Sequence, residues 1–290
     1  MSVIVGYSID KKGRGGLDLA RTLAESSAET LVVACAVAAR WETVSAGRAV
    51  DRDYHEHLLS LARATLSDAE ALLGPTRVPV TYEVVKGRSV ARTLLQAAAE
   101  HEASVLVLGS GQAGAWGRIA LGSVTDYLTH ASPVPVVLAP RGHHWPTGSR
   151  LERVTVAVRG EEESFKVLEE ALALSRRWRA PLRVLVFAVR GQTMWPPVGG
   201  LYAEDEIMRE RLKDAQAFLD EVQARFPDAG IEGTIGVGRN WGEALEDPGW
   251  ADVEVLVLGS STESGASRVF LGSTALRIVR VAPVPVVLVP

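Results

Sequence analysis

Cysteine is almost absent from this sequence, which has 290 residues and a single cysteine, Cys35. One cysteine excludes an internal disulfide, and its place inside an apolar run indicates an unreactive core thiol. No apolar run approaches the roughly 20 residues of a membrane span, and polar residues follow the first apolar run too soon for a secretory signal. These absences predict a cytoplasmic protein with no membrane partner.

An excess of positive charge is also missing, because 31 Lys and Arg residues face 35 Asp and Glu residues and the net charge is −4. Without a basic face interleaved with aromatics, nucleic acid is disfavoured as a partner. Gly-Lys never occurs, which excludes a Walker A loop. His55 and His57 would point to different sides of a helix, and His143 and His144 are expected at the surface of a linker, so no metal site is predicted.

The most prominent feature that is present is an internal repeat. Residues 105–140 read VLVLGSGQAGAWGRIALGSVTDYLTHASPVPVVLAP, and residues 255–290 read VLVLGSSTESGASRVFLGSTALRIVRVAPVPVVLVP, an offset of 150 positions. A constant offset without gaps over this length indicates a duplicated domain. We therefore predict a first domain over residues 1–140, a linker over 141–150 and a second domain over 151–290.

Continuous apolar runs alternate with helical spacing in both copies, which predicts two tandem α/β domains, each with an open five-stranded parallel sheet of Rossmann-like type. The first copy has predicted strands at 2–7, 30–38, 78–85, 105–108 and 134–138 and helices at 15–28, 50–73, 90–100 and 124–131. The second has predicted strands at 154–158, 181–189, 231–237, 255–258 and 284–289 and helices at 164–177, 203–225, from 242 and from 274. The repeated Pro-x-Pro-Val-Val-Leu confines the fifth strand to an edge, where the copies are expected to pair as a pseudo-dimer within one chain.

A ligand is expected at the loop after the fourth strand, because open α/β sheets bind ligands beyond the carboxyl ends of their strands. Residues 109–122 are rich in glycine and lead into a helix, whose free N–H groups and dipole favour a phosphate. Ser123 adds a hydroxyl there, and with Asp126 it is also expected to cap the helix. The first part of this loop matches the dinucleotide fingerprint only formally, since the next strand ends without an acidic residue.

Both copies resemble the universal stress protein family, whose ATP-binding members carry G-x2-G-x9-G-[ST] after the fourth strand and an aspartate after the first. The resemblance implies an adenine-nucleotide α-hydrolase-like fold, a stress-response role, ATP as ligand with Mg beside it, and a homodimer of the whole chain. The residues that it places at the nucleotide are Gly6, Tyr7, Ser8, Val33, Gly109, Ser110, Gln112, Gly122, Ser123 and Val124 in the first copy and Gly259, Thr262, Gly272 and Ser273 in the second.

Both copies depart from the family pattern. Gln112 and Thr262 stand at the second glycine, and Ser8 and Arg159 stand where the family has its aspartate. Residues 161–163 are glutamates, and like charge beside a triphosphate opposes binding, so the first copy is the favoured site. No acid–base pair or nucleophile triad emerges, so no enzyme is predicted, although a slow ATPase stays open.

An alternative from another class is an interaction scaffold that holds no nucleotide. The second copy contains the insertion GQTMWPPVGGL at residues 191–201, which places Trp195 on a glycine-flanked loop suited to a protein partner of unknown identity. A tryptophan packed against its own domain is the other interpretation of this segment.

Overall fold

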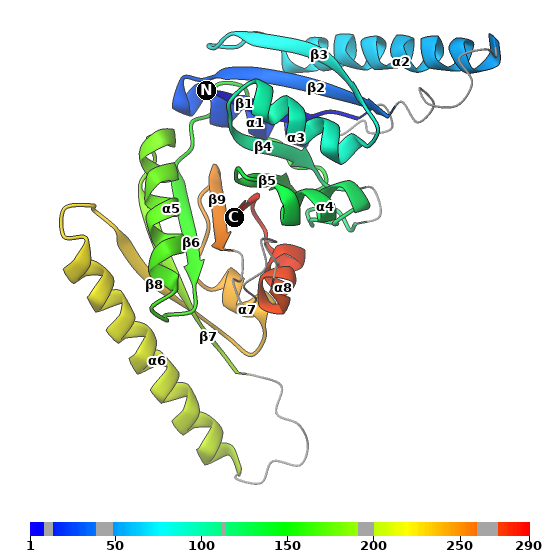
Figure 1. Ribbon diagram of the computed structural model, residues 1–290. Helices are drawn as coiled ribbons and strands as arrows, with labels where there is room; N and C mark the ends of the chain where they lie inside the picture. The colour runs from blue at the N-terminus through cyan, green and yellow to red at the C-terminus, as the bar shows by residue number, and fades with distance from the viewer. Residues whose placement is uncertain (9–13, 39–48, 112–113, 191–199, 260–271) are drawn as a thin grey trace. The chain divides into compact units, whose positions relative to one another are not determined.

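The structure is a computed structural model of the 290-residue chain, and it describes all residues except 9–13, 39–48, 112–113, 191–199 and 260–271 (Figure 1). The chain divides into two compact units, of which the first contains Met1–Arg150 and the second contains Leu151–Ser261 and Leu271–Val289. Among the described residues, no helix is long and apolar enough to cross a membrane.

The first unit alternates strands and helices along the chain. Its elements are β1 (Ser2–Gly6), α1 (Gly15–Ser27), β2 (Thr30–Ala38), α2 (Ala49–Leu73), β3 (Val80–Gly87), α3 (Val90–Glu100), β4 (Ala103–Gly109), α4 (Ser123–Ala131) and β5 (Val136–Ala139). The strands are parallel and stand in the order β3-β2-β1-β4-β5. The order reverses between β1 and β4, which is the switch point of a doubly wound sheet.

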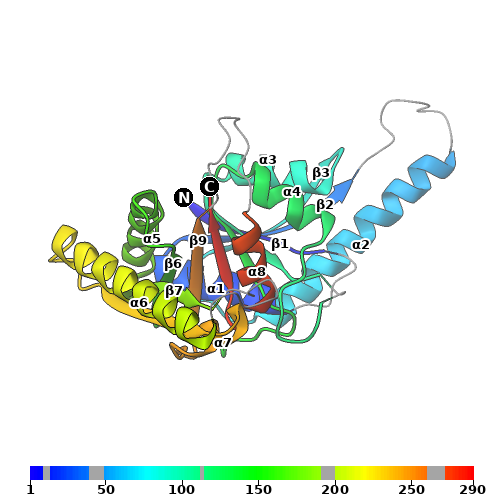
Figure 2. The same ribbon diagram turned by 90° about the horizontal axis from the view of Figure 1, so that it is seen from below.

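The strands of the first sheet are apolar throughout because helices cover both of its faces. Ile4, Val33 and Leu106 have no exposed surface. Figure 2 shows α3 and α4 on one face of this sheet and α1 and α2 on the other, as right-handed crossovers require. Burial on both faces removes the polar alternation of a half-exposed strand, which is why the sequence shows continuous apolar runs.

The second unit repeats the first. Its elements are β6 (Arg153–Val158), α5 (Ser164–Trp178), β7 (Leu182–Val189), α6 (Gly200–Arg225), β8 (Glu232–Gly238), α7 (Trp241–Glu246), β9 (Glu254–Gly259), α8 (Ser273–Val281) and β10 (Val286–Val289). These strands are also parallel and follow the order β10-β9-β6-β7-β8. The prediction of two tandem parallel α/β domains is confirmed, and the pairing of the two copies through their fifth strands stays a prediction.

The boundaries differ from the prediction where proline intervenes. The fifth strand of the first unit begins at Val136 and not at Val134, and that of the second begins at Val286 and not at Val284. Proline has no N–H to donate, so Pro135 contributes only its carbonyl, which accepts from the Leu106 N–H at 2.9 Å. The backbone hydrogen bonds of each fifth strand are therefore complete only after the second proline of its Pro-x-Pro motif.

Candidate functional site

The ends of two neighbouring strands bring the predicted residues of the first copy together. In the register of the sheet, Gly6 at the end of β1 stands beside Leu108 of β4 and Ala34 of β2. Ser8 and Gly109 therefore begin their loops at the same edge of the sheet. This edge lies at the switch point, where ligands of doubly wound sheets bind.

Two residues predicted at the nucleotide belong to the core. Val33 has no exposed surface, and Tyr7 is 7% exposed, with its N–H donated to the Ala34 carbonyl at 2.9 Å. Burial raises the pKa of the Tyr7 phenol, and the negative charge of Asp68 adds to the effect. Of the first strand's candidates, Gly6 and Ser8 retain partly exposed surface at the edge.

The glycine loop is closed by its own hydrogen bonds. The Ser110 hydroxyl accepts from the Ala120 N–H at 2.8 Å, and the Gly111 N–H donates to the Ala120 carbonyl at 3.1 Å. Among the described residues, a side chain added at Gly109 or Gly122 would meet no atom within 4 Å apart from those of its chain neighbours. The backbone at both glycines therefore faces open space that a ligand can approach closely, whereas Gln112 lies outside the described residues.

Helix α4 begins at this loop without a side-chain cap. Its N-cap is Gly122 in an extended conformation, whose carbonyl accepts from the Asp126 N–H at 2.8 Å. Ser123 is the first residue of the helix and is exposed, and Val124 is half-buried. The predicted capping role of Ser123 is therefore wrong, because the residue lies one position inside the helix. In the described part of the chain no side chain occupies the first N–H groups of α4, which leaves them for an anion.

Asp18 in α1 is a buried carboxylate that the sequence analysis did not identify as such. It is fully buried beside three basic side chains, with Arg14 at 3.1 Å, Arg21 at 3.2 Å and the His144 Nδ1 at 2.5 Å. Arg21 is also buried and donates to the Leu73 carbonyl at 2.9 Å. The charge of Asp18 is balanced inside the fold, so this residue does not replace the family aspartate at Ser8.

The signal for this ion cluster was the spacing of Arg14, Asp18 and Arg21 on one helix, where residues three and four apart meet. The contact with His144 crosses 126 positions of sequence and had no local signal. The prediction that His143 and His144 are both surface residues is wrong for His143, whose Nε2 is buried without a hydrogen-bond partner among the described residues. Asp10, the first carboxylate after β1 in the sequence, lies outside the described residues.

The second unit has an equivalent helix start, but the residues around it differ from those of the first unit. Gly272 is the N-cap of α8, Ser273 is its first residue and is exposed, and Thr262 lies outside the described residues. Arg159, which stands at the position of the family aspartate, directs its Nη2 to the Thr274 hydroxyl at 3.4 Å. Gly259 packs closely on α5, since a side chain added there would lie 2.3 Å from Val167.

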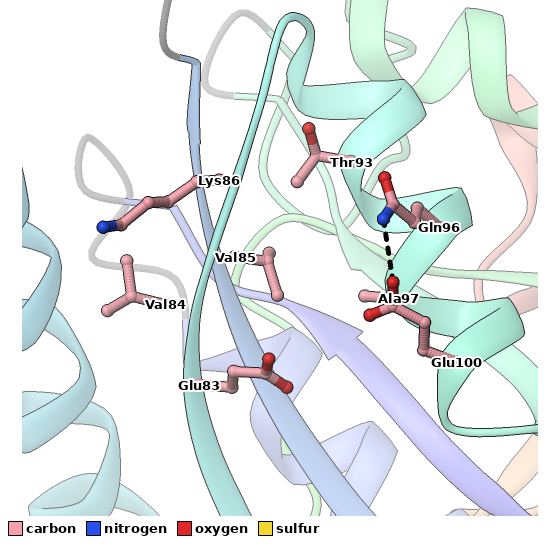
Figure 3. A pocket seen from close by; sticks show the side chains of 8 residues that line it. All are labelled: Glu83, Val84, Val85, Lys86, Thr93, Gln96, Ala97 and Glu100. Atoms are coloured by element: carbon pink, nitrogen blue, oxygen red, sulfur yellow. Dashed lines mark hydrogen bonds between the residues drawn. The ribbon is translucent and has the colours of Figure 1, made fainter.

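A cavity of about 260 Å³ lies away from the glycine loop, between β3 and α3 (Figure 3). Figure 3 shows Glu83 and Val85 on the α3 side of the strand and Val84 and Lys86 on its other side. Glu83 contacts the His101 Nε2 at 2.7 Å, and Glu100 accepts from Gln96 at 2.8 Å. Both carboxylates thus have partners within the protein. Across the described ranges, no group of three metal-ligating side chains occurs.

The fold and the site define a class of protein, a tandem of doubly wound α/β domains that each have a helix start at the switch point. The model of the universal stress protein family matches residues 2–140 and again residues 150–290. The chain belongs to the universal stress protein family.

Mycobacterial relatives match most or all of this chain. A universal stress protein of Mycobacterium tuberculosis strain H37Rv is 36% identical over 293 aligned positions that cover 100% of both chains. One from Mycolicibacterium smegmatis is 28% identical over 80% of this chain and 76% of the relative. The solved structure of a universal stress protein from Archaeoglobus fulgidus has a TM-score of 0.59 and 18% identity, and the alignment covers 99% of this chain and 97% of that one. This last likeness concerns the fold alone.

Proposed function

We propose that the first unit binds an adenine nucleotide such as ATP through its glycine loop, and that the chain serves as a regulatory module in a stress response. The observation that carries this proposal is the open backbone at Gly109 and Gly122 next to the uncapped start of α4. Free N–H groups at a helix start, together with the positive end of its dipole, favour a phosphate. Membership in the family supports the choice of ligand class.

The residues of the first unit fit the phosphate end of such a ligand. Gly109, Gly122 and Ser123 would hold phosphate oxygens through backbone N–H groups and one hydroxyl, and Gly6 and Ser8 would border the ribose. A bound ATP would bring its own charge and its Mg²⁺. The proposal concerns binding, and any hydrolysis would need a water-activating group in addition.

The first unit is the better site because the second has competing groups at the same place. The Thr274 hydroxyl at the start of α8 is already engaged by Arg159. Glu161, Glu162 and Glu163 are exposed just before α5, and the pairing of Glu162 with Arg225 at 3.6 Å leaves most of this negative charge uncompensated. Negative charge near a triphosphate raises the free energy of binding.

The test is a set of thermal melts of the full chain with and without Mg-ATP, together with mass analysis of nucleotide released from denatured protein. ATP at 100 times its Kd should add about 2.7 kcal/mol to the stability of the unit that binds it. Ser123→Asp should abolish the shift because it adds negative charge at the phosphate end, whereas the matched variant Ser273→Asp should keep it. A parent protein that yields no nucleotide and shows no shift with Mg-ATP contradicts the proposal.

A partner-binding scaffold is the second candidate. Trp195 lies outside the described residues, but Trp116 in the glycine loop is 76% exposed, which is unusual for so large an apolar side chain. Trp116→Ala should then weaken the capture of a partner from cell extract. Equal capture by parent and variant would count against this surface.

A further inference from the structure

The stretch at residues 141–145, which we call the post-β5 segment, packs on the first unit although the sequence predicts a linker there. Trp145 is 3% exposed, and His143 lies against its ring at a centroid distance of 4.7 Å. A side chain added at Gly15 would lie 2.7 Å from the His143 carbonyl oxygen, so the segment touches the start of α1. The contact between His144 and Asp18 at 2.5 Å attaches it further.

This segment also holds the glycine loop through Arg141. The Gly117 N–H donates to the Arg141 carbonyl at 2.9 Å, and the Arg141 N–H donates to the Arg118 carbonyl at 3.0 Å. The Arg141 guanidinium donates to the Gly114 carbonyl at 2.6 Å. Within the described part of the loop, Arg141 thus makes three hydrogen bonds with residues 114, 117 and 118. Ser110 and Gly111 join the start of the loop to Ala120 near its end.

Gly142 adds a fourth contact with the loop. Its φ is +74°, and a side chain added there would lie 2.3 Å from the Trp116 ring. The indole therefore covers the glycine directly. A residue other than glycine would be strained by its backbone and would also displace Trp116.

We propose that Arg141 is a positioning residue of the phosphate site, which holds residues 114–118 so that the N–H groups of Gly122 and Ser123 face the ligand before it binds. This inference rests on the proposed function of the first unit. A loop that is ordered in advance loses less conformational entropy when the ligand binds, so the guanidinium contributes to affinity without touching the nucleotide. The clamp between Asp18 and His144 fixes the segment from which Arg141 acts.

The experiment compares Arg141→Ala, Arg141→Lys and the matched control Arg150→Ala in the full chain. Arg150 is exposed in the same part of the chain, and no hydrogen bond joins it to the described residues of the loop. Arg141→Ala should weaken Mg-ATP binding about 3- to 10-fold, the range expected for one exposed charge-assisted hydrogen bond. Arg141→Lys should recover most of the affinity because lysine also donates to a carbonyl, and Arg150→Ala should bind like the parent. Gly142→Ala should weaken binding as well, because it displaces the loop from the other side.

A second readout is independent of nucleotide. Hydrogen exchange of the peptide over residues 110–122, measured without ATP, should be faster in Arg141→Ala than in the parent or in Arg141→Lys, with exchange of β1 and β4 unchanged. A parent that does not bind ATP overturns the proposed function. A parent that binds ATP, with Arg141→Ala equal to it in affinity and in loop exchange, overturns the positioning role alone.

Discussion

His143 is a residue whose burial disfavours the protonated, charged form of its imidazole. Burial lowers the pKa of its imidazole to about 4, the charge of Asp18 opposes this effect and His144 adds to it. The unfolded chain binds the proton near the ordinary pKa of 6.5 and the folded chain only near 4. Stability is therefore unaffected above the ordinary pKa and falls as the pH decreases from 6.5 towards 4, by about 3 kcal/mol in total.

The loss of stability at low pH leads to a prediction for acid unfolding. Between pH 7.5 and pH 5, urea unfolding of the first unit should show a loss of about 2 kcal/mol that is due to His143. His143→Phe keeps an aromatic ring against Trp145 and has no proton to bind, so it should lack this part of the pH dependence. Parallel pH profiles for parent and variant would show that His143 is not buried as a neutral ring.

Cys35 gives a second prediction at the scale of one residue. It has no exposed surface in β2, and burial raises its thiol pKa to about 11. Since the thiolate is the reactive form, Cys35 should not react with a thiol reagent at pH 8 in the native protein and should react at once in denaturant. Reaction of the native protein at the rate of the denatured chain would contradict the placement of β2.

At the scale of elements, three strands of the second unit are joined by a buried ion network. Glu254 at the start of β9 has no exposed surface and accepts from Arg183 of β7 at 2.9 Å and from Arg153 of β6 at 2.8 Å. Arg183 also donates to the carbonyls of Pro248 and Gly249 at 3.0 and 2.9 Å. Burial lowers the pKa of Arg183 because removal from water disfavours the charged guanidinium, and the charge of Glu254 opposes this effect.

Removal of the carboxylate should therefore be costly. Glu254→Gln leaves the Arg183 guanidinium, which is 1% exposed, without its counter-charge and should destabilise the second unit by about 3 to 5 kcal/mol. Glu232→Gln is the matched control, because Glu232 is an exposed partner of Arg153 at 3.8 Å and should change stability by less than about 1 kcal/mol. Equal denaturation midpoints for the two variants would contradict the network.

At the scale of the whole molecule, the two copies share a fold but place their buried charges at opposite ends of their sheets. In the first unit, Asp18 lies at the start of α1, at the carboxyl edge where a ligand is expected. In the second, Glu254 lies at the amino end of its strand. We attribute this difference to divergence after duplication, which stabilises each copy by its own means.

The asymmetry predicts the stoichiometry of binding. Calorimetric titration of the full chain with Mg-ATP should saturate near one nucleotide per chain, because the glutamates at residues 161–163 disfavour the second copy. Ser273→Asp should leave this value unchanged. Saturation at two nucleotides per chain would show that both copies bind and that the glutamates at residues 161–163 do not exclude a phosphate.

Most of the architecture could be predicted from local patterns, and the parts that could not be predicted have a common cause. The β and α elements follow from apolar runs and helical spacing, and the glycine loop follows from its repetition at Gly109 and Gly259. The burial of Asp18 and His143 could not be predicted, because it depends on contacts between α1 and residues more than one hundred positions away. The start of α4 at Ser123 depended on backbone geometry at Gly122, which no residue pattern specifies.

The sequence by itself determined that this protein is a tandem of two α/β domains of one family. The internal repeat and the hydrophobic periods that indicate this can be recognised in the order of the residues, without knowledge of which distant residues touch. Only the tertiary structure decided which side chains are buried or paired with distant groups. Asp18 became a buried ion pair, Val33 and Tyr7 became core, and Arg141 became a support for the glycine loop. Each of these outcomes depends on which distant groups the folded chain brings within hydrogen-bonding distance.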